Sequence, residues 1–345
     1  MEMLNSVSLL LANDFWTIII DFFARTIVNY GWAIIVFTIC LKLVLSPLDV
    51  FQRVSTQKQS RVMAVMQPEI TALQEKYKND REKLNQETNK LYKKYRVNVG
   101  GMCFTMLITM AISLIVLFTL YSSIRSYGNE KLYTTYQDLD NAYIEAQTEY
   151  ATLTDADLSQ EEYIAQAVRI KYDEISEQNS WLWIKNVWKS DTNTSQFVDF
   201  DDYADHFNLE GEERDNARVR YDSIVSTIVG DGRDNNGYYV IMIFAVLVSF
   251  LTQFLSAKLL APKGQKMNLT NKIMLAVIPI TMLILAMTSN VVFTLYIITN
   301  SLMTAIISTI ISLVLKRINK NKDDKDLLLK SRNVEVVEYS RNYKK

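Results

Sequence analysis

The chain has 345 residues, of which 49% are hydrophobic, and its 37 Lys and Arg residues nearly balance its 38 Asp and Glu residues. The apolar residues gather in long blocks, which is typical of a membrane protein and argues against a soluble globular domain. Two cysteines, Cys40 and Cys103, lie in or beside apolar segments, and His206 is the single histidine, so the composition implies no disulfide framework, no thiolate metal site and no His-rich metal site.

The first apolar block, residues 30–48, carries one cation, Lys42. Nineteen helical residues cover about 28 Å, which is close to the hydrocarbon thickness of a bilayer, so the block predicts a membrane span. A charged side chain inside a span costs about 2.5 to 3.5 kcal/mol and needs water, a partner or a function. Thr38, Lys42 and Ser46 recur every four residues and share one side of the predicted helix.

We expect an all-α membrane protein with five transmembrane helices, a helical hairpin and a mainly helical extracytoplasmic insertion. Residues 7–28 mix apolar clusters with polar and charged residues, which favours a segment lying in the membrane interface. Residues 1–14 contain no Lys or Arg, so we expect the N-terminus to be retained rather than removed as a signal peptide. The predicted segments are an interfacial segment at 1–29, spans at 30–48, 102–122, 238–257, 273–288 and 291–315, a hairpin at 49–99, an acidic domain at 123–237, a basic loop at 258–272 and a basic tail at 316–345.

The charges between the spans predict an orientation. Residues 50–98 hold eleven Lys or Arg against five Asp or Glu, and the tail at 316–345 holds ten against five. Residues 124–237 instead hold ten against twenty-four. Because short basic loops remain in the cytoplasm, the N-terminus is expected outside and the C-terminus in the cytoplasm of a multi-pass cell membrane protein.

Both regions between spans have helical periodicity. Apolar residues at three- and four-residue spacing over 63–77 and again over 84–95 predict two antiparallel helices on the cytoplasmic side, interrupted at Asn79 and Asp80. Outside the membrane, similar spacing over 132–150 predicts a helix. Ser159 and Glu162 form a capping-box pattern that starts another helix running toward Ile175.

Three other stretches invite functional interpretations. The sequence WLWIKNVW at 181–188 is expected at the membrane surface, where Trp is favoured. DFDDYADH at 199–206 and DGRDNNG at 231–237 suggest calcium, but DGRDNNG lacks an acceptor at the third loop position and a Glu at the twelfth. A solvated turn is therefore favoured, and no metal, cofactor or catalytic residue is assigned.

Polar residues also recur every three or four positions in three further spans. One interpretation is that these ridges hold neighbouring helices together by hydrogen bonds. Another is that they line a hydrated concavity together with Lys42, for which no span interior offers an Asp or Glu counter-ion. A third interpretation is that Lys42 snorkels to the cytoplasmic interface. The candidate groove residues are Lys42, Thr38, Ser46, Thr105, Thr109, Ser113, Ser249, Gln253, Ser256, Tyr296, Asn300 and Thr304.

The sequence resembles the YidC/Oxa/Alb family of membrane protein insertases. The resemblance is carried by residues 30–48, 67–98, 100–112, 181–188, 251–254 and 295–302, in order, over about 200 residues. It implies a hydrophilic groove open to the cytoplasm and to lipid. Lys42 stands where the family usually has an Arg, and Thr109 stands where the family has a groove Gln.

The resemblance implies an insertase and chaperone for client membrane proteins that performs no covalent chemistry, with a Sec translocon as a partner. The basic tail would attract ribosomal RNA. The rival prediction from another class is an ion-coupled transporter in which Lys42 titrates, against which stand the missing intramembrane acid and the lack of a visible inverted repeat. A receptor that reads the acidic domain would leave the polar ridges unexplained.

Overall fold

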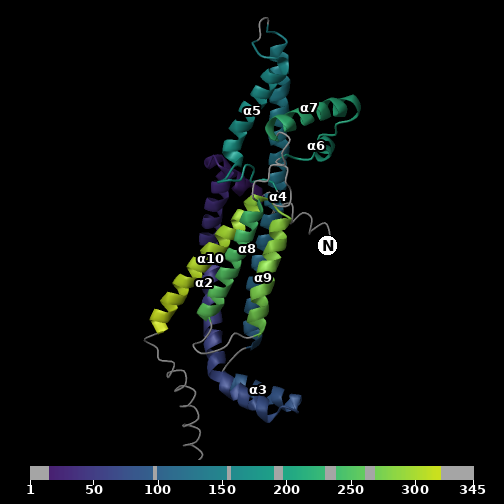
Figure 1. The fold of residues 1–345 in the computed structure, drawn as a ribbon. Coiled ribbons are helices and arrows are strands. Elements are labelled where there is room, and N and C mark those ends of the chain that lie inside the picture. Colours follow the sequence, from purple (N-terminus) through teal and green to yellow (C-terminus); the bar gives the residue numbers. More distant parts are fainter. Residues whose placement is uncertain are drawn as a thin grey trace, which may run out of the picture. The chain divides into compact units, whose positions relative to one another are not determined.

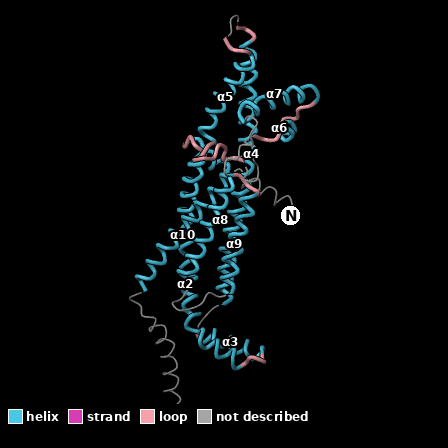
Figure 2. The backbone as a smooth tube through the Cα atoms, viewed as in Figure 1, coloured by secondary structure: helices cyan, strands magenta, loops and turns pink. Residues whose placement is uncertain are grey.

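The computed structural model describes residues 15–95, 99–153, 157–189, 197–229, 238–260 and 269–319. Regular structure in these residues is helical, apart from one isolated bridge between Trp181 and Ile184 (Figure 2). The all-α prediction is therefore confirmed for the described chain. The motif at 231–237 and most of the basic tail, residues 320–345, lie outside the described residues.

Figure 1 shows the order of the helices along the chain. A helix over residues 15–26 comes first. It is followed by α2 (Tyr30–Lys76), α3 (Arg81–Lys94), α4 (Val99–Tyr150), α5 (Gln160–Asn179), α6 (Phe200–His206), α7 (Gly211–Val229), α8 (Tyr238–Leu260), α9 (Leu269–Met287) and α10 (Val291–Asn319).

Four helices contain stretches long and apolar enough to cross a membrane. The stretches are Tyr30–Gln57, Ala111–Tyr150, Tyr238–Lys258 and Val291–Leu315. They overlap the expected first, second, third and fifth spans, and the second stretch is displaced most, because it begins at Ala111 and ends at Tyr150 where 102–122 was expected. The expected fourth span, residues 273–288, is covered by α9, which is not one of these four, so the count of five spans stays a prediction.

Two of the helices continue beyond the expected ends of their spans. α2 runs on to Lys76 through the expected junction at residue 49, and α4 runs on to Tyr150 through the junction at residue 123. Pro47 lies inside α2 and cannot donate a hydrogen bond to the carbonyl of Leu43. The hydroxyl of Ser46 donates to that oxygen at 2.8 Å, so the helix continues through the proline with this carbonyl satisfied.

The described chain divides into two compact units. Unit one comprises Met1–Leu41, Val116–Phe250 and Val277–Ser301, and unit two comprises Lys42–Ile115, Leu251–Ala276 and Leu302–Lys345. α2, α4, α8, α9 and α10 each contribute a segment to both units.

One apolar core of unit one joins the helix at 15–26 to the unit-one parts of α2, α4, α8 and α10. Trp16 and Ile20 are buried in this core, whereas Ile18 and Phe22 on the same short helix are 69% and 64% exposed. The helix is thus amphipathic, as expected of an interfacial segment. The Trp16 indole donates to Thr119 Oγ1 on α4 at 3.0 Å.

The segment at 181–189 divides its aromatic residues between this core and the surface. Ile184, Val187 and Trp188 are at most 3% exposed, whereas Leu182 and Trp183 are 66% and 52% exposed. Leu182 and Trp183 are thus the exposed side chains of this cluster, and its expected place at the membrane surface stays a prediction. The other three residues are core residues of the unit.

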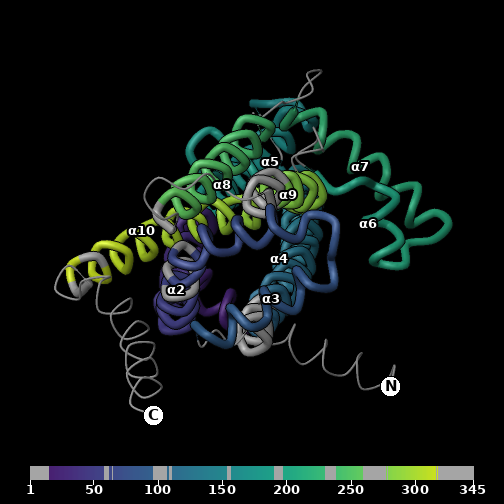
Figure 3. The backbone as a smooth tube through the Cα atoms, turned by 90° about the horizontal axis from the view of Figure 1, so that it is seen from below, coloured from purple at the N-terminus to yellow at the C-terminus, as the bar shows by residue number. Residues whose placement is uncertain are grey.

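A second core of unit one is built on the C-terminal part of α4. Tyr136, Leu139 and Ala146 are buried against residues of α5 and α7, which confirms the predicted helix over 132–150 and its apolar seam. α5 begins with the predicted capping box between Ser159 and Glu162, and it extends four residues past Ile175 to Asn179. In Figure 3, α6 and α7 lie side by side.

Charged groups stabilise this region. Arg220 on α7 donates to both carboxylate oxygens of Asp140 on α4, at 2.6 and 2.9 Å, and Asp140 is 7% exposed. In the candidate calcium stretch, Asp199 caps α6, and Arg214 pairs with Asp201 at 3.0 Å and with Asp205 at 2.9 Å. These acidic side chains have protein partners, and the stretch forms the helix α6 rather than a turn.

In unit two, α3 packs against the C-terminal part of α2. Met66, Ile70 and Leu91 form the buried centre of this contact. The Tyr95 hydroxyl donates to Glu69, whose carboxylate also pairs with Lys94 at 3.6 Å. The two predicted seams thus face each other, although the side of the membrane on which they lie stays a prediction.

Candidate functional site

Two of the candidate groove residues on α2, Thr38 and Ser46, donate hydrogen bonds to carbonyls of their own helix. Thr38 is 1% exposed and donates to the carbonyl of Ile34 at 2.6 Å. Ser46 donates to Leu43, as described above. Both hydroxyls therefore satisfy backbone carbonyls, a structural role that Ser and Thr often have in membrane helices.

Lys42, between these two residues, is paired with an acid. Its Nζ lies 2.9 Å from Oδ2 of Asp49, and the side chains of Lys42 and Asp49 are 12% and 28% exposed. The expectation that Lys42 lacks a counter-ion was therefore wrong. Seven residues turn a helix by nearly two full turns, so Asp49 returns to within about 20° of the direction of Lys42 and lies about 10 Å along the axis. The long lysine side chain and the Asp49 carboxylate together span that distance.

The spacing of Lys42 and Asp49 in the sequence already indicates this ion pair. Asp49 is the first residue after the predicted span at 30–48, and counting acids only within span interiors left it out. A search for acids seven positions away on the same helix face would have found it.

A second cation follows on the same face. Arg53 lies four residues after Asp49 and eleven after Lys42, again within about 20° of the direction of Lys42. Its Nη2 donates to the backbone carbonyl of Ser256 on α8 at 3.5 Å, and its Nε is buried without a hydrogen-bond partner among the described residues. Sequence reasoning placed Arg53 in a basic loop and missed it. We call Lys42, Asp49 and Arg53 the charged stripe of α2.

The candidate residues of the other helices are only partly brought together. In unit one, Ser249 on α8 and Ser301 on α10 exchange a hydrogen bond at 3.3 Å, which supports glue between helices for Ser249. Tyr296 is 5% exposed and its ring stacks on Phe293 at 5.6 Å. Asn300 is half-buried in the same unit.

In unit two, Gln253, Ser256 and Thr304 are half-buried and Ser113 is exposed. The Ser256 carbonyl is the group that binds Arg53. The side chains of Thr105 and Thr109 are not among those that the structure describes. The grouping of all twelve residues into one groove therefore stays a prediction.

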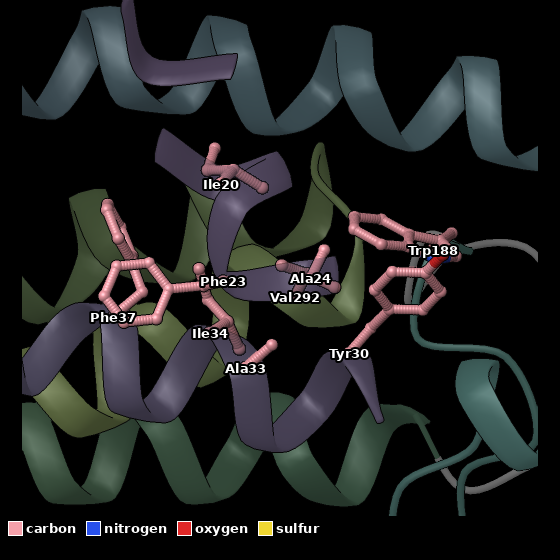
Figure 4. A pocket seen from close by; sticks show the side chains of 9 residues that line it. All are labelled: Ile20, Phe23, Ala24, Tyr30, Ala33, Ile34, Phe37, Trp188 and Val292. Atoms are coloured by element: carbon pink, nitrogen blue, oxygen red, sulfur yellow. The ribbon is translucent and has the colours of Figure 1, made fainter. Parts of the chain in front are cut away.

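Figure 4 shows a pocket in unit one that differs from the predicted groove. It lies between the helix at 15–26, the start of α2, the segment at 181–189 and α10. Most of its lining is apolar, and none of the twelve candidate residues contributes to it. The lining residues are Ile20, Phe23, Ala24, Tyr30, Ala33, Ile34, Phe37, Trp188 and Val292.

The charged stripe carries two cations and one carboxylate on one side of α2. Because the Asp49 carboxylate lies beside the Lys42 ammonium, it offsets part of the attraction that this positive charge exerts on other anions. The neighbouring hydroxyls of Thr38 and Ser46 are already engaged with backbone carbonyls. Lys42 and Arg53 are therefore the positive charges of this face, and Asp49 is the negative charge between them along the helix.

Comparison with known proteins finds relatives that are named as insertases. A protein of Clostridium tetani named membrane protein insertase YidC is 40% identical over 116 residues, which are 32% of this chain and 50% of that protein. A protein of the same name from Caldanaerobacter subterraneus is 37% identical over 109 residues, 32% of this chain and 49% of that protein. One from Nitratidesulfovibrio vulgaris strain DP4 is 40% identical over 106 residues, 31% of this chain and 18% of that protein.

These alignments span half or less of the relatives' length. They offer no support for the transporter interpretation. A sequence model of the 60Kd inner membrane protein family, however, matches residues 22–320, which is most of the chain. The resemblance found in the sequence is thereby confirmed, and the chain belongs to this family, the YidC/Oxa family of multi-pass membrane proteins.

Proposed function

We propose that this protein is a membrane protein insertase that lowers the barrier for moving short polar segments of client proteins across the bilayer. The observation that carries the proposal is an ammonium, Lys42, that is 88% shielded from solvent inside a candidate membrane span of a chain from this family. Acidic residues of a client are attracted to this charge. Their apolar path through the bilayer is then shorter.

The membrane potential assists this step. One elementary charge that moves through 100 mV changes the free energy by about 2.3 kcal/mol. Lys42 and the polar ridges of α4, α8 and α10 line the hydrophilic groove in this proposal, and the client's own apolar helix then slides into lipid. The protein acts without covalent chemistry, with client membrane proteins and the Sec translocon as partners.

The charge at position 42 provides the test. Lys42→Arg keeps the charge and should retain insertion of clients with acidic translocated segments, whereas Lys42→Ala and Lys42→Glu should reduce it about fivefold or more. Lys258→Ala, which removes an exposed lysine at the end of α8, is the matched control. Insertion is measured in proteoliposomes by protection of the client segment from protease.

Because Lys42 pairs with Asp49, this test needs a control for the stability of the fold. Lys42→Ala leaves the Asp49 carboxylate without its partner, and an unpaired, partly buried charge is destabilising. The double variant Lys42→Ala with Asp49→Asn removes both charges and separates folding from function. Full insertion of acidic clients by this folded double variant would contradict the electrostatic mechanism.

The basic tail is proposed to bind ribosomes during insertion. Its ten Lys and Arg residues attract RNA phosphates, and this attraction weakens as salt rises. Deletion of residues 320–345 should reduce co-sedimentation with ribosomes at low salt several-fold. Unchanged co-sedimentation would show that the tail serves only as a cytoplasmic anchor.

A further inference from the structure

The charged stripe places one carboxylate between two cations on a single helix face. Asp49 pairs with Lys42, seven residues before it, at 2.9 Å. Arg53 follows Asp49 by four residues, the spacing at which an acid and a base on a helix are neighbours. Asp49 therefore has a second cation within reach of a change of rotamer.

An ion pair with Lys42 keeps the Asp49 carboxylate in its observed position. Its Oδ2 atom is buried and forms no hydrogen bond of good geometry within the described chain, so the ion pair with Lys42 is the contact that stabilises it. The Arg53 Nε is likewise buried and has no hydrogen-bond partner among those residues. An Asp49 side chain that leaves Lys42 thus has a donor available at Arg53.

An incoming carboxylate exchanges with Asp49 at little net electrostatic cost. Lys42 retains an anionic partner throughout, and the displaced Asp49, which is 28% exposed, keeps contact with solvent while it turns toward Arg53. A neutral polar group cannot make the same exchange, because Lys42 would lose a charged partner and remain partly buried. The pair therefore discriminates between acidic and neutral segments.

We propose that Asp49 is a specificity-determining residue: it is the resting counter-ion of Lys42, which an acidic client residue displaces toward Arg53. This inference rests on the proposed insertase function and adds an internal competitor to it. The competitor prevents Lys42 from remaining unpaired between clients, and it lowers the apparent affinity for acidic segments by the fraction of time that Asp49 occupies the ammonium.

The test uses the full chain in proteoliposomes and two clients that differ only by Asp or Asn residues in the translocated segment. If Asp49 occupies Lys42 at least two thirds of the time, Asp49→Asn should raise the ratio of acidic-client insertion to neutral-client insertion about threefold or more. Asp49→Glu keeps the charge and should behave like the unaltered protein. Glu75→Gln, which removes an exposed carboxylate from the same helix, is the control for net charge.

A second pair of variants separates exchange from mere support of the fold. Arg53→Gln removes the alternative partner of Asp49 and should slow the acidic client in the otherwise unaltered protein. It should have no such effect in the Asp49→Asn background, where nothing remains to be displaced. Equal effects of Arg53→Gln in both backgrounds would overturn the exchange.

A third measurement needs no variant. A membrane-permeant carbodiimide activates a carboxylate, which then forms an amide with a neighbouring amine while the carbodiimide leaves as a urea. Without client, mass spectrometry should find the amide between Asp49 and Lys42. Added acidic client should reduce it and produce a client amide at Lys42.

The outcomes distinguish the two proposals. If the unaltered protein inserts neither client, the proposed function fails. If it inserts the acidic client but Asp49→Asn leaves the ratio of acidic-client insertion to neutral-client insertion unchanged or lowers it, or if added client leaves the internal amide unchanged, the function stands and the role of Asp49 is wrong.

Discussion

At the residue scale, Lys189 is a buried cation outside the candidate spans. It is 5% exposed, and its backbone carbonyl accepts a hydrogen bond from Val291 at the start of α10, at 3.1 Å. Burial lowers the pKa of the Lys189 ammonium to about 8, and the carboxylates of Asp199 and Asp202 oppose this shift. The folded chain therefore releases this proton at a lower pH than the unfolded chain does.

The sign of the pH dependence follows from proton counting. An unfolded lysine has a pKa near 10.4, so between pH 8 and 10 the unfolded chain binds more protons and stability rises with pH. We expect an increase of about 1.5 kcal/mol from pH 8 to 9.5. Above about pH 10 the trend should reverse, because burial raises the pKa of Tyr203 and of Tyr221 to about 12 and these groups ionise more readily when unfolded.

Urea unfolding of the full chain in detergent at several pH values measures this dependence. Lys189→Met should be more stable than the unaltered protein at pH 7 and should lose the rise between pH 8 and 9.5. Lys185→Met, which replaces an exposed lysine of the same segment, should keep the rise. If the stability of Lys189→Met still rises between pH 8 and 9.5, another group causes the rise.

At the element scale, a close contact fixes α4 against the start of α10. Gly128 lies in the middle of α4, and a Cβ atom there would lie 3.1 Å from Cε3 of Trp188 and would overlap the Asn290 amide. Asn290 is also engaged at both ends: it accepts a hydrogen bond from the Phe293 amide at 3.1 Å and donates to the Ile124 carbonyl at 3.4 Å. The glycine thus permits an approach that a side chain would prevent.

Gly128→Ala tests this contact, because helix propensity and packing predict opposite signs. Propensity alone would stabilise the helix by about 1 kcal/mol, whereas overpacking of a buried contact costs about 1 to 3 kcal/mol. We expect net destabilisation and faster hydrogen exchange at residues 124–128 and 290–294. Asn141→Ala, at an exposed position of α4, should instead be neutral or slightly stabilising. A stabilised Gly128→Ala protein would show that Trp188 and Asn290 move aside easily.

The long helices also change how the predicted segments are understood. A polar junction at residues 50–55 and the glycines at 100 and 101 would allow the predicted hairpin to move if they lay in loops. Residues 50–55 are helical within α2, however, and Gly100 and Gly101 are helical within α4.

At the scale of the whole molecule, charge is distributed by region. The region between α4 and α8 is acidic, and the regions between α2 and α4 and after α10 are basic. With the positive-inside rule, this distribution still predicts that the acidic domain faces outside and the hairpin faces the cytoplasm.

Single cysteines test the orientation. In a background in which Cys40 and Cys103 are replaced by serine, Glu161→Cys at the start of α5 should react with a membrane-impermeant maleimide in intact cells. Glu75→Cys near the end of α2 should react only after lysis. Both positions are exposed, so lack of reaction reports the membrane rather than burial. Labelling in the opposite order would reverse the topology.

Much of the fold was predictable because it depends on neighbours within one helix. The capping box of Ser159 and Glu162 and the seam of Tyr136, Leu139 and Ala146 follow from spacings of three or four residues, and the four candidate spans follow from the length of their apolar stretches. Such patterns act over one or two helical turns, so they do not depend on how the rest of the chain packs.

The candidate site was predictable in part. Lys42 and its side of the helix follow from the sequence, and the counter-ion Asp49 could have been found by extending the same helix by two turns. The role of Ser46 could be anticipated from Pro47, which frees the Leu43 carbonyl. These relations again lie within a single helix.

The sequence by itself therefore determined most of the helices, their apolar faces, the cation at position 42 and the family. Only the tertiary structure decided that Arg53 contacts the Ser256 carbonyl, that Ser249 bonds to Ser301, and that Trp188 is buried while Trp183 is exposed. Each of these outcomes joins residues far apart in the chain. Periodicity fixes which face of a helix a side chain occupies, but the partner that covers this face is fixed by packing, and packing depends on all helices at once.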